Sequence, residues 1–271
     1  MTVFAGIVAL AVFAGVFGSM LGVGGGVIMV PVLSIGFGLP IKTAIATSMV
    51  CVVATSAMAQ LSFVKRGMTN QRLGFLLEVA SAAGAVLGGL AAVLVDSRVL
   101  QGAFAVVLLY VVWQMNRGGA AVVVERGGPL GAAFYDPTEG REVSYGVRHT
   151  RLGFVLSIGA GNVAGLLGVG GGVFKVPIMS VLMGVPLKAA IATSNLMIGV
   201  TAATGAAIFY GRGYVDPSYA APAALGILIG ASFGPRLAAR LPARVLSIVF
   251  QIVLAGFAVL MVVKAAGGGM P

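Results

Sequence analysis

Two glycine clusters carry the residue types best suited to binding a ligand. Each begins a short apolar segment that contains a proline, Pro31 in the first and Pro177 in the second. Glycines let the backbone approach a ligand closely, and a helix that begins there directs free N–H groups and the positive end of its dipole outward. Those donors suit sulfonate or carboxylate oxygens, so the clusters predict an anion site with the two prolines as hinges. The alternative is that the glycines allow tight helix packing in a membrane. The six glycines are Gly24, Gly25, Gly26, Gly170, Gly171 and Gly172.

A lysine follows the second cluster but not the first. Lys175 stands three residues after Gly172, where the first copy has Met29. A charge inside a membrane segment is costly and usually functional, so we expect Lys175 to hold the sulfonate or carboxylate group of one substrate. The alternative is that its ammonium group extends to a membrane interface. Lys42 and Lys188 stand at segment starts, which is more typical of interfacial anchors than of ligands.

Small polar side chains form the remaining candidate group. They occur in otherwise apolar segments that follow the two short ones, and their hydroxyl and amide groups can either donate to anion oxygens or stabilise helix contacts. We expect the amide of Asn195 to be a ligand, because Met49 occupies the corresponding position in the first copy. Glu78 has two interpretations, a coupling group that faces the interior or a residue at the membrane interface. The small polar residues are Thr47, Ser48, Thr193, Ser194 and Asn195.

The sequence excludes most catalytic and metal chemistry. It has one cysteine, Cys51, within an apolar run, and one histidine, His149, in a polar region without histidine or cysteine neighbours. Neither a zinc nor an iron–sulfur site nor a Ser–His–Asp arrangement can be assembled from these residues. The glycine clusters lack the lysine and hydroxyl residue that end a nucleotide-binding P-loop. We therefore expect a protein that is not an enzyme, with no metal and no cofactor.

The composition places the chain in a lipid bilayer. Of its 271 residues, 59% are hydrophobic and 9% are charged, whereas soluble domains have roughly 25% charged residues. The net charge of +10 is scattered between apolar runs rather than gathered on one face, which indicates membrane orientation and not nucleic-acid binding. The apolar segments are 2–21, 27–39, 43–64, 73–95, 99–116, 152–167, 173–185, 187–210, 218–238 and 244–264.

These segments form two copies of one unit. Residues 21–48 read LGVGGGVIMVPVLSIGFGLPIKTAIATS and residues 167–194 read LGVGGGVFKVPIMSVLMGVPLKAAIATS, which are identical at 18 of 28 positions. We predict a first membrane repeat over 1–116 and a second over 152–271, joined by a polar connector over 117–151. Lys and Arg are enriched in opposite loops of the two halves. The positive-inside rule therefore predicts an inverted-topology repeat with a cytoplasmic connector and periplasmic termini.

The expected fold is an all-α polytopic membrane protein whose short segments meet at a central site. Segments 27–39 and 173–185 would each form about 20 Å of helix, which is too short for a hydrocarbon core of about 30 Å. Paired short segments, interrupted by Gly and Pro in matching halves, point to the binding site of a transporter. We expect broken or re-entrant helices, and the sequence leaves open whether each one spans the bilayer or turns back.

The motif G-V-G-G-G-V-x-x-V-P, followed in each copy by P-[IL]-K-x-A-I-A-T-S, and the connector motif Tyr135-Asp136-Pro137 resemble the TauE/SafE family of sulfite and sulfonate exporters. The resemblance implies secondary transport of small anions across the bacterial inner membrane, chiefly sulfite or C2 organosulfonates such as sulfoacetate. Some members are associated with carboxylates. It also implies that the motif residues named above bind the substrate, and Lys175 is our own addition to them.

Alternating access, in which the two repeats move about a central site, is the mechanism that we expect. Export would follow the anion gradient and the inside-negative membrane potential. A proton-coupled route would require Glu78 or Lys175 to titrate. A passive anion channel and an uptake carrier for carboxylates or sulfonates are the alternatives, and the sequence leaves the oligomeric state open.

Overall fold

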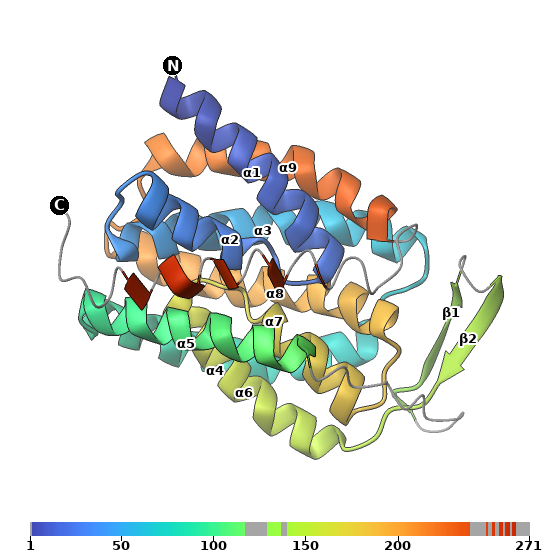
Figure 1. Cartoon of the computed structure of the whole chain (residues 1–271). Helices are drawn as coiled ribbons and strands as arrows, with labels where there is room; N and C mark the ends of the chain where they lie inside the picture. The colour runs from blue at the N-terminus through green and yellow to red at the C-terminus, as the bar shows by residue number, and fades with distance from the viewer. Residues whose placement is uncertain are drawn as a thin grey trace.

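A computed structural model of the chain contains a bundle of long helices (Figure 1). It describes residues 2–116, 129–136 and 140–238, together with positions 248, 251–252, 255–256, 258–260 and 262–263. Six described helices are long and apolar enough to cross a membrane, which confirms the predicted all-α polytopic fold. Much of the predicted segment 244–264, and residues 117–128 and 137–139 of the connector, lie outside the described residues. The six spans are Phe4–Leu21, Ile41–Lys65, Gln71–Leu94, Thr150–Leu167, Leu187–Gly211 and Pro217–Leu237.

The order of elements in the first half recurs in the second. Each short helix ends at a proline, which has no N–H to donate to the carbonyl four residues earlier, and a π-helical turn continues it. The first half contains α1 (Thr2–Leu21), α2 (Gly26–Pro31), a π-helical turn (Val32–Gly36), α3 (Ile41–Lys65), α4 (Gln71–Leu94) and α5 (Ser97–Asn116). The second half contains α6 (Thr150–Leu167), α7 (Gly172–Pro177), a π-helical turn (Ile178–Leu182), α8 (Leu187–Gly211) and α9 (Pro217–Ala238).

The short helices α2 and α7 fold back beside the helices that precede them. Gly25 and Gly171 adopt left-handed conformations at their starts, with φ of 72° and 77°, which glycine reaches without steric cost. After this reversal the ring of Phe37 lies against Gly6, near the start of α1, and Met183 likewise contacts the start of α6. Each short segment therefore re-enters toward the end of the bundle at which the preceding helix began.

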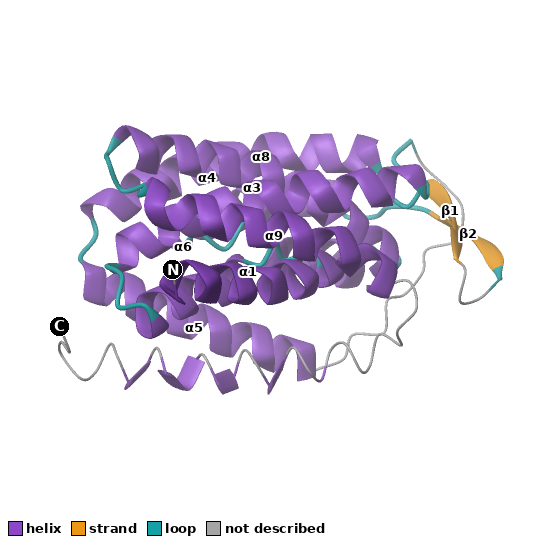
Figure 2. Ribbon diagram, turned by 90° about the horizontal axis from the view of Figure 1, so that it is seen from above, coloured by secondary structure: helices purple, strands orange, loops and turns teal. Residues whose placement is uncertain are grey.

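The two halves interlock through two closely packed helix pairs. α1 packs along α9, and α4 packs along α6, so each pair takes one helix from each half (Figure 1; Figure 2). Gly161 on α6 lies against the backbone of Ser81 on α4, and Gly230 on α9 lies against the backbone of Val12 on α1. Small residues allow membrane helices to approach this closely. α3 and α8 pack against each other between the two pairs, at the centre of the molecule.

The described part of the connector forms an antiparallel hairpin of β1 (Ala132–Asp136) and β2 (Arg141–Tyr145). It lies at one end of the bundle, which we call the hairpin end (Figure 1). Asp136 Oδ1 forms an ion pair with Lys188 Nζ, at the start of α8, over 2.6 Å. Lys188, which the sequence suggests as an interfacial anchor, therefore binds the connector.

A second contact fixes the hairpin to the start of α4. Asn70 Nδ2 donates to the carbonyl oxygen of Leu130 at 2.8 Å, while Asn70 Oδ1 accepts from the N–H of Leu73 and caps α4. Tyr145 packs at the same place beside Phe134. Burial raises the pKa of the Tyr145 phenol, and its hydrogen bond with Asn70 offsets part of that rise.

The opposite end of the bundle joins α3, α4 and the loop before α9. Lys42 Nζ, at the start of α3, donates to the carbonyl oxygen of Val93 near the end of α4 at 2.8 Å. The same ammonium group lies 5.8 Å from the ring centre of Tyr214, which precedes α9. The loop between α3 and α4 therefore lies at the hairpin end, whereas the matching loop between α8 and α9 lies at the opposite end.

Candidate functional site

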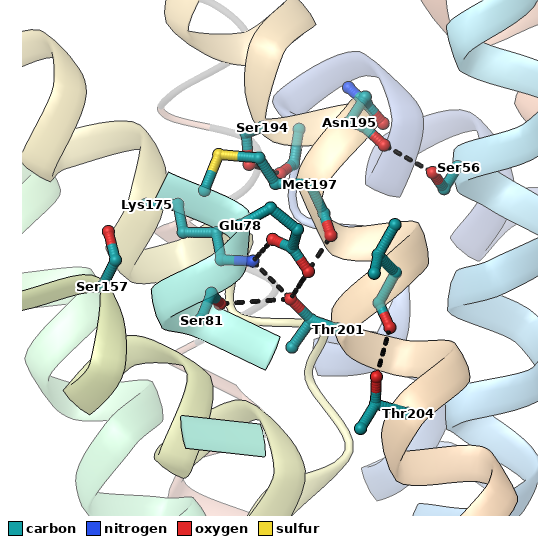
Figure 3. Close-up of polar contacts among 12 residues, drawn as sticks. Ser56, Glu78, Ser81, Ser157, Lys175, Ser194, Asn195, Met197, Thr201 and Thr204 are labelled. Carbon is teal, nitrogen blue, oxygen red and sulfur yellow. Dashed lines mark hydrogen bonds and ion pairs between the residues drawn. The ribbon is translucent and has the colours of Figure 1, made fainter. Parts of the chain in front are cut away.

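Lys175 and Glu78 form an ion pair in the interior of the helix bundle. Lys175 Nζ lies 2.9 Å from Glu78 Oε2, and the two residues are only 1% and 5% exposed (Figure 3). A charge so deep in a membrane protein needs a partner, because an isolated ion loses its hydration without compensation. The pairing of these two residues provides that compensation.

Thr201 links the two charged groups through its hydroxyl. Lys175 Nζ donates to Thr201 Oγ1 at 2.6 Å, and Thr201 Oγ1 donates to Glu78 Oε1 at 2.6 Å. Ser81 Oγ lies 3.1 Å from the same hydroxyl (Figure 3). Charge-assisted hydrogen bonds of this kind are stronger than neutral ones. The resulting cluster of Lys175, Glu78, Thr201 and Ser81, which we call the charged cluster, is a preorganised arrangement of donors and acceptors.

Three helices supply the charged cluster. Lys175 projects from α7, whose position is set by the reversal of the chain at Gly171. Glu78 and Ser81 are one turn apart on α4, and Thr201 lies near the middle of α8. The cluster therefore joins both halves of the chain, since α4 belongs to the first and α7 and α8 to the second.

The positions that correspond to Lys175 and Glu78 in the opposite half of the chain carry no charge. Met29 corresponds to Lys175, and Ala224 corresponds to Glu78. Thr55, which corresponds to Thr201, donates instead to the carbonyl oxygens of Gly24 and Cys51, at 3.1 and 2.9 Å. The charged cluster therefore has no charged counterpart at the corresponding positions of the repeat, which suits the binding of a single ion.

The glycine clusters bring the two halves into backbone contact. A Cβ atom on Gly26 would lie 2.5 Å from the carbonyl oxygen of Gly168, and one on Gly172 would overlap that of Gly22. Ser48 donates to the Gly168 carbonyl, and Ser194 donates to the Gly22 carbonyl, both at 2.8 Å. In this conformation the glycines and the two serines therefore serve helix packing, which is one of the two interpretations that the sequence allows.

The space between the two glycine clusters is filled by hydrocarbon side chains. A Cβ atom on Gly24 would lie 2.8 Å from both Ile198 Cδ1 and Val52 Cγ1, and one on Gly170 would lie 2.6 Å from Val52 Cγ1. Val52 and Ile198 are themselves fully buried. Binding of an anion between the clusters therefore requires these side chains to move, and that predicted site stays a prediction.

The other predicted ligands do not meet Lys175. Asn195 Nδ2 donates to the carbonyl oxygens of Ser19 and Ile191, at 3.2 and 3.0 Å, toward α1. Thr193 Oγ1 accepts from the N–H of Asn70 at 3.0 Å. Thr47 Oγ1 and Asn195 Oδ1 are buried without a hydrogen-bond partner among the described residues. The amide donors of Asn195 are thus engaged by carbonyl groups in this conformation.

Sequence reasoning missed Thr201 and Ser81, and the interfacial interpretation of Glu78 was wrong, since that residue is buried. Comparison of the two copies contains a signal that could have found the pair. Glu78 in the first copy and Lys175 in the second are each matched by an uncharged residue in the other copy, Ala224 and Met29. Two opposite charges, one in each copy, that both stand where the other copy is apolar indicate mutual compensation inside the membrane.

Comparison with known proteins identifies the family. Residues 7–261 match the family model described as Sulfite exporter TauE/SafE. The chain belongs to the TauE/SafE family. A protein named Probable membrane transporter protein YunE, from Bacillus subtilis (strain 168), is 24% identical to this TauE/SafE chain over 255 residues, which cover 92% of the chain and 93% of YunE. No solved structure matches this chain. The resemblance expected from the duplicated motif is therefore confirmed over nearly the whole length.

Proposed function

We propose that this TauE/SafE protein is a secondary transporter that exports small sulfur oxyanions, either sulfite or C2 organosulfonates such as sulfoacetate, across the bacterial inner membrane. The observation that carries the proposal is Lys175, a cation that is 1% exposed and lies where the two halves of the chain meet. A buried cation is costly to maintain and is the natural counter-ion of an anionic substrate. The family description as sulfite exporters supports the choice of substrate class.

In this proposal the anion takes the place of the Glu78 carboxylate on Lys175. The ammonium group has three N–H donors, and a sulfonate or sulfite group has three oxygens that accept hydrogen bonds. The Thr201 hydroxyl lies 2.6 Å from the same ammonium group, and the Ser81 hydroxyl lies 3.1 Å from that of Thr201, so the two supply further donors. Glu78 Oε2, at 2.9 Å from Lys175 Nζ, marks the place of one substrate oxygen.

We further propose that the two halves form an inverted repeat, with the hairpin end in the cytoplasm. The loops at residues 66–70 and 212–216 correspond in sequence but lie at opposite ends of the bundle, as an inverted repeat requires. Described Lys and Arg are concentrated at the hairpin end, which favours the cytoplasm for that end. They are Lys65, Arg66, Arg72, Arg141, Arg148, Arg151, Lys188 and Arg236 at the hairpin end, against Lys42, Arg98 and Arg212 at the other.

Alternating access would occur by movement of the two halves about their shared glycine contacts. Val52 and Ile198 fill the centre in the present conformation, and in this proposal that conformation is the occluded state of the cycle. Opening toward either side requires the helix pairs α1–α9 and α4–α6 to separate from the central helices α3 and α8. The prolines at the ends of α2 and α7, Pro31 and Pro177, are the proposed hinges, because the helical hydrogen bonds are interrupted there.

The test is transport by the purified protein in liposomes. Vesicles are loaded in turn with sulfite, sulfoacetate, taurine, sulfate or lactate, and efflux is measured for the wild type, Lys175→Ala and Thr204→Val. Thr204 is the matched control because its hydroxyl bonds within α8 on an exposed face. We expect saturable efflux of sulfite or sulfoacetate that Lys175→Ala abolishes and Thr204→Val retains.

Other outcomes of this assay would contradict the proposal. Efflux that does not saturate, and that unlabelled anion on the opposite side does not accelerate, would indicate a passive channel. Transport of lactate alone would assign the protein to carboxylates. Unchanged efflux in Lys175→Ala would remove Lys175 from the site.

A further inference from the structure

We propose that Glu78 is the proton-carrying group of this transporter, so that each monovalent anion crosses the membrane together with one proton. This inference rests on the proposed function and names the ion that is coupled to it. In the protein without substrate, the Glu78 carboxylate forms an ion pair with Lys175. In the protein with bound substrate, the anion forms the ion pair with Lys175, and Glu78 carries a proton.

The argument begins with the charge that the interior can hold. Lys175 and Glu78 are buried together, and their charges cancel. Addition of a monovalent anion to this cluster would leave one uncompensated negative charge in the bundle, which is strongly unfavourable in a membrane. Protonation of Glu78 removes that charge. The empty and the loaded forms are then both neutral, and both can pass through the occluded conformation.

Within the described helices α4, α6, α7 and α8, Lys175 is the one residue whose positive charge is close enough to balance Glu78. α4 itself carries Arg72 in its first turn, α6 carries Arg151 at its start, and α8 carries Lys188 at its start. All three lie at the hairpin end, and Lys188 is paired with Asp136. An anion on Lys175 therefore leaves Glu78 without a nearby cation, and a proton is the remaining source of positive charge.

The geometry also gives the protonated carboxyl group a partner. Thr201 Oγ1 lies 2.6 Å from both Glu78 Oε1 and Lys175 Nζ. When Glu78 is a carboxylate, the Thr201 hydroxyl donates to it. When Glu78 is a carboxylic acid, its O–H can donate to the same oxygen, while the Thr201 hydroxyl turns toward the bound anion. A hydroxyl can act in either direction, so no buried polar group is left without a partner in either state.

The proton balance of one cycle is simple. At the face where the anion enters, the Glu78 carboxylate accepts one proton from water and becomes a carboxylic acid, and the anion binds Lys175. At the other face the anion leaves, the carboxylic acid returns its proton to water, and the carboxylate binds Lys175 again. Transport of a monovalent anion is therefore electroneutral, so the membrane potential does not drive it, in contrast to the expectation from the sequence.

The test uses 2-hydroxyethanesulfonate, a C2 organosulfonate that stays a monovalent anion throughout the pH range of the assay. Any proton that moves with it must therefore be carried by the protein. Wild-type protein in liposomes is given an outward sulfonate gradient, anion efflux and internal pH are recorded together, and the membrane potential is set with potassium and valinomycin. We expect one proton to leave with each anion, and an efflux rate that does not change with the membrane potential.

The variant Glu78→Gln separates the two parts of the cycle. Its loaded form is neutral and can cross, but its empty form carries the unpaired charge of Lys175. We expect exchange of labelled for unlabelled sulfonate to continue, whereas net efflux falls at least tenfold and no longer follows an imposed pH gradient. Glu142→Gln makes the same chemical change on the exposed strand β2 and should behave like the wild type. If Glu78→Gln does not fold, the proton count on the wild type decides alone.

Two failures can be told apart. Anion efflux without protons, or efflux driven by the membrane potential, would overturn the coupling while leaving the transporter intact. Absence of transport for 2-hydroxyethanesulfonate and for every anion of the first assay would overturn the proposed function, and this inference would fall with it.

Discussion

The hydroxyl of Ser48 donates to the carbonyl oxygen of Gly168 at 2.8 Å. The equivalent residues of the two copies make the same bond in the other direction, from Ser194 to Gly22, also at 2.8 Å. Both glycines directly follow the C-termini of helices, α1 and α6, where carbonyl groups have no partner within the helix. Each half of the chain therefore caps a helix of the other half, and the two copies are joined at the centre by a reciprocal pair of hydrogen bonds.

Removal of either hydroxyl should destabilise the protein to a similar extent. We expect Ser48→Ala and Ser194→Ala each to lower the free energy of unfolding by about 1–3 kcal/mol, because a buried carbonyl oxygen loses its donor. Unfolding of the purified protein in detergent measures the change. Ser232→Ala is the control, since that hydroxyl bonds within α9 on a partly exposed residue and its loss should have little effect. A large difference between the two central variants would contradict the reciprocal arrangement.

Two glycines on α6 allow a matched test of the α4–α6 contact. A methyl group on Gly161 would overlap the carbonyl group of Ser81, whereas nothing lies within 4 Å of the corresponding position on Gly159. Alanine favours a helix over glycine by about 1 kcal/mol. We therefore expect Gly159→Ala to leave stability unchanged or raise it slightly, and Gly161→Ala to lower the unfolding temperature or prevent folding. Equal behaviour of the two variants would show that this contact is not tight.

The sequence predicts the membrane fold and the two copies well, because both depend on local patterns. Apolar runs of sufficient length mark the spans, and the duplicated glycines and prolines mark the reversals at Gly25 and Gly171. Each of these features is set by residues close together in the chain. The choice between spanning and re-entrant short helices could not be made, because it depends on the contact of Phe37 with the start of α1.

The partner of Lys175 could not be predicted in the same way. Glu78 lies 97 residues earlier in the chain, on a helix of the other half. Glu78 contacts Lys175 because α4, a helix of the first half, packs on α6 of the second half, next to α7. The two copies have nearly the same helical pattern, so the sequence does not indicate that helices are shared between them. For the same reason the position of Glu78, about two turns into α4, favours the membrane interface over the interior in the sequence, whereas the structure buries the residue.

The ion pair should be more sensitive to loss of one charge than to loss of both. We expect Lys175→Met alone and Glu78→Gln alone each to lower the free energy of unfolding by about 3–5 kcal/mol, since each leaves a buried charge without its partner. The double variant removes both charges and should recover most of that loss while remaining unable to transport anions. Unfolding of the three variants in detergent forms a double-mutant cycle. Additive losses in the double variant would show that the two charges are not coupled.

A substrate anion should replace the missing carboxylate in Glu78→Gln. If Lys175 binds the sulfonate, 2-hydroxyethanesulfonate at a free concentration one hundred times its Kd should stabilise this variant by about 2.7 kcal/mol. The wild type should gain less, because its own carboxylate competes for Lys175. Lys175→Met is the control and should gain nothing. A thermal-shift series against sulfonate concentration measures all three, and equal stabilisation of the control would place the anion elsewhere.

The orientation of the protein can be tested through single cysteines at its two ends. The native Cys51 is fully buried, so labelling of the unmodified protein should be low. Ser218→Cys lies at the start of α9, opposite the hairpin end, and Glu142→Cys lies on β2 of the hairpin; both positions are exposed. We expect a membrane-impermeant maleimide to label Ser218→Cys in intact cells and Glu142→Cys only after the inner membrane is permeabilised, because the positive residues concentrate at the hairpin end. The reverse pattern would place the connector outside the cytoplasm. Labelling of both variants from the same side would contradict the placement of the hairpin and the start of α9 at opposite faces of the membrane. The inverted repeat would then be contradicted as well.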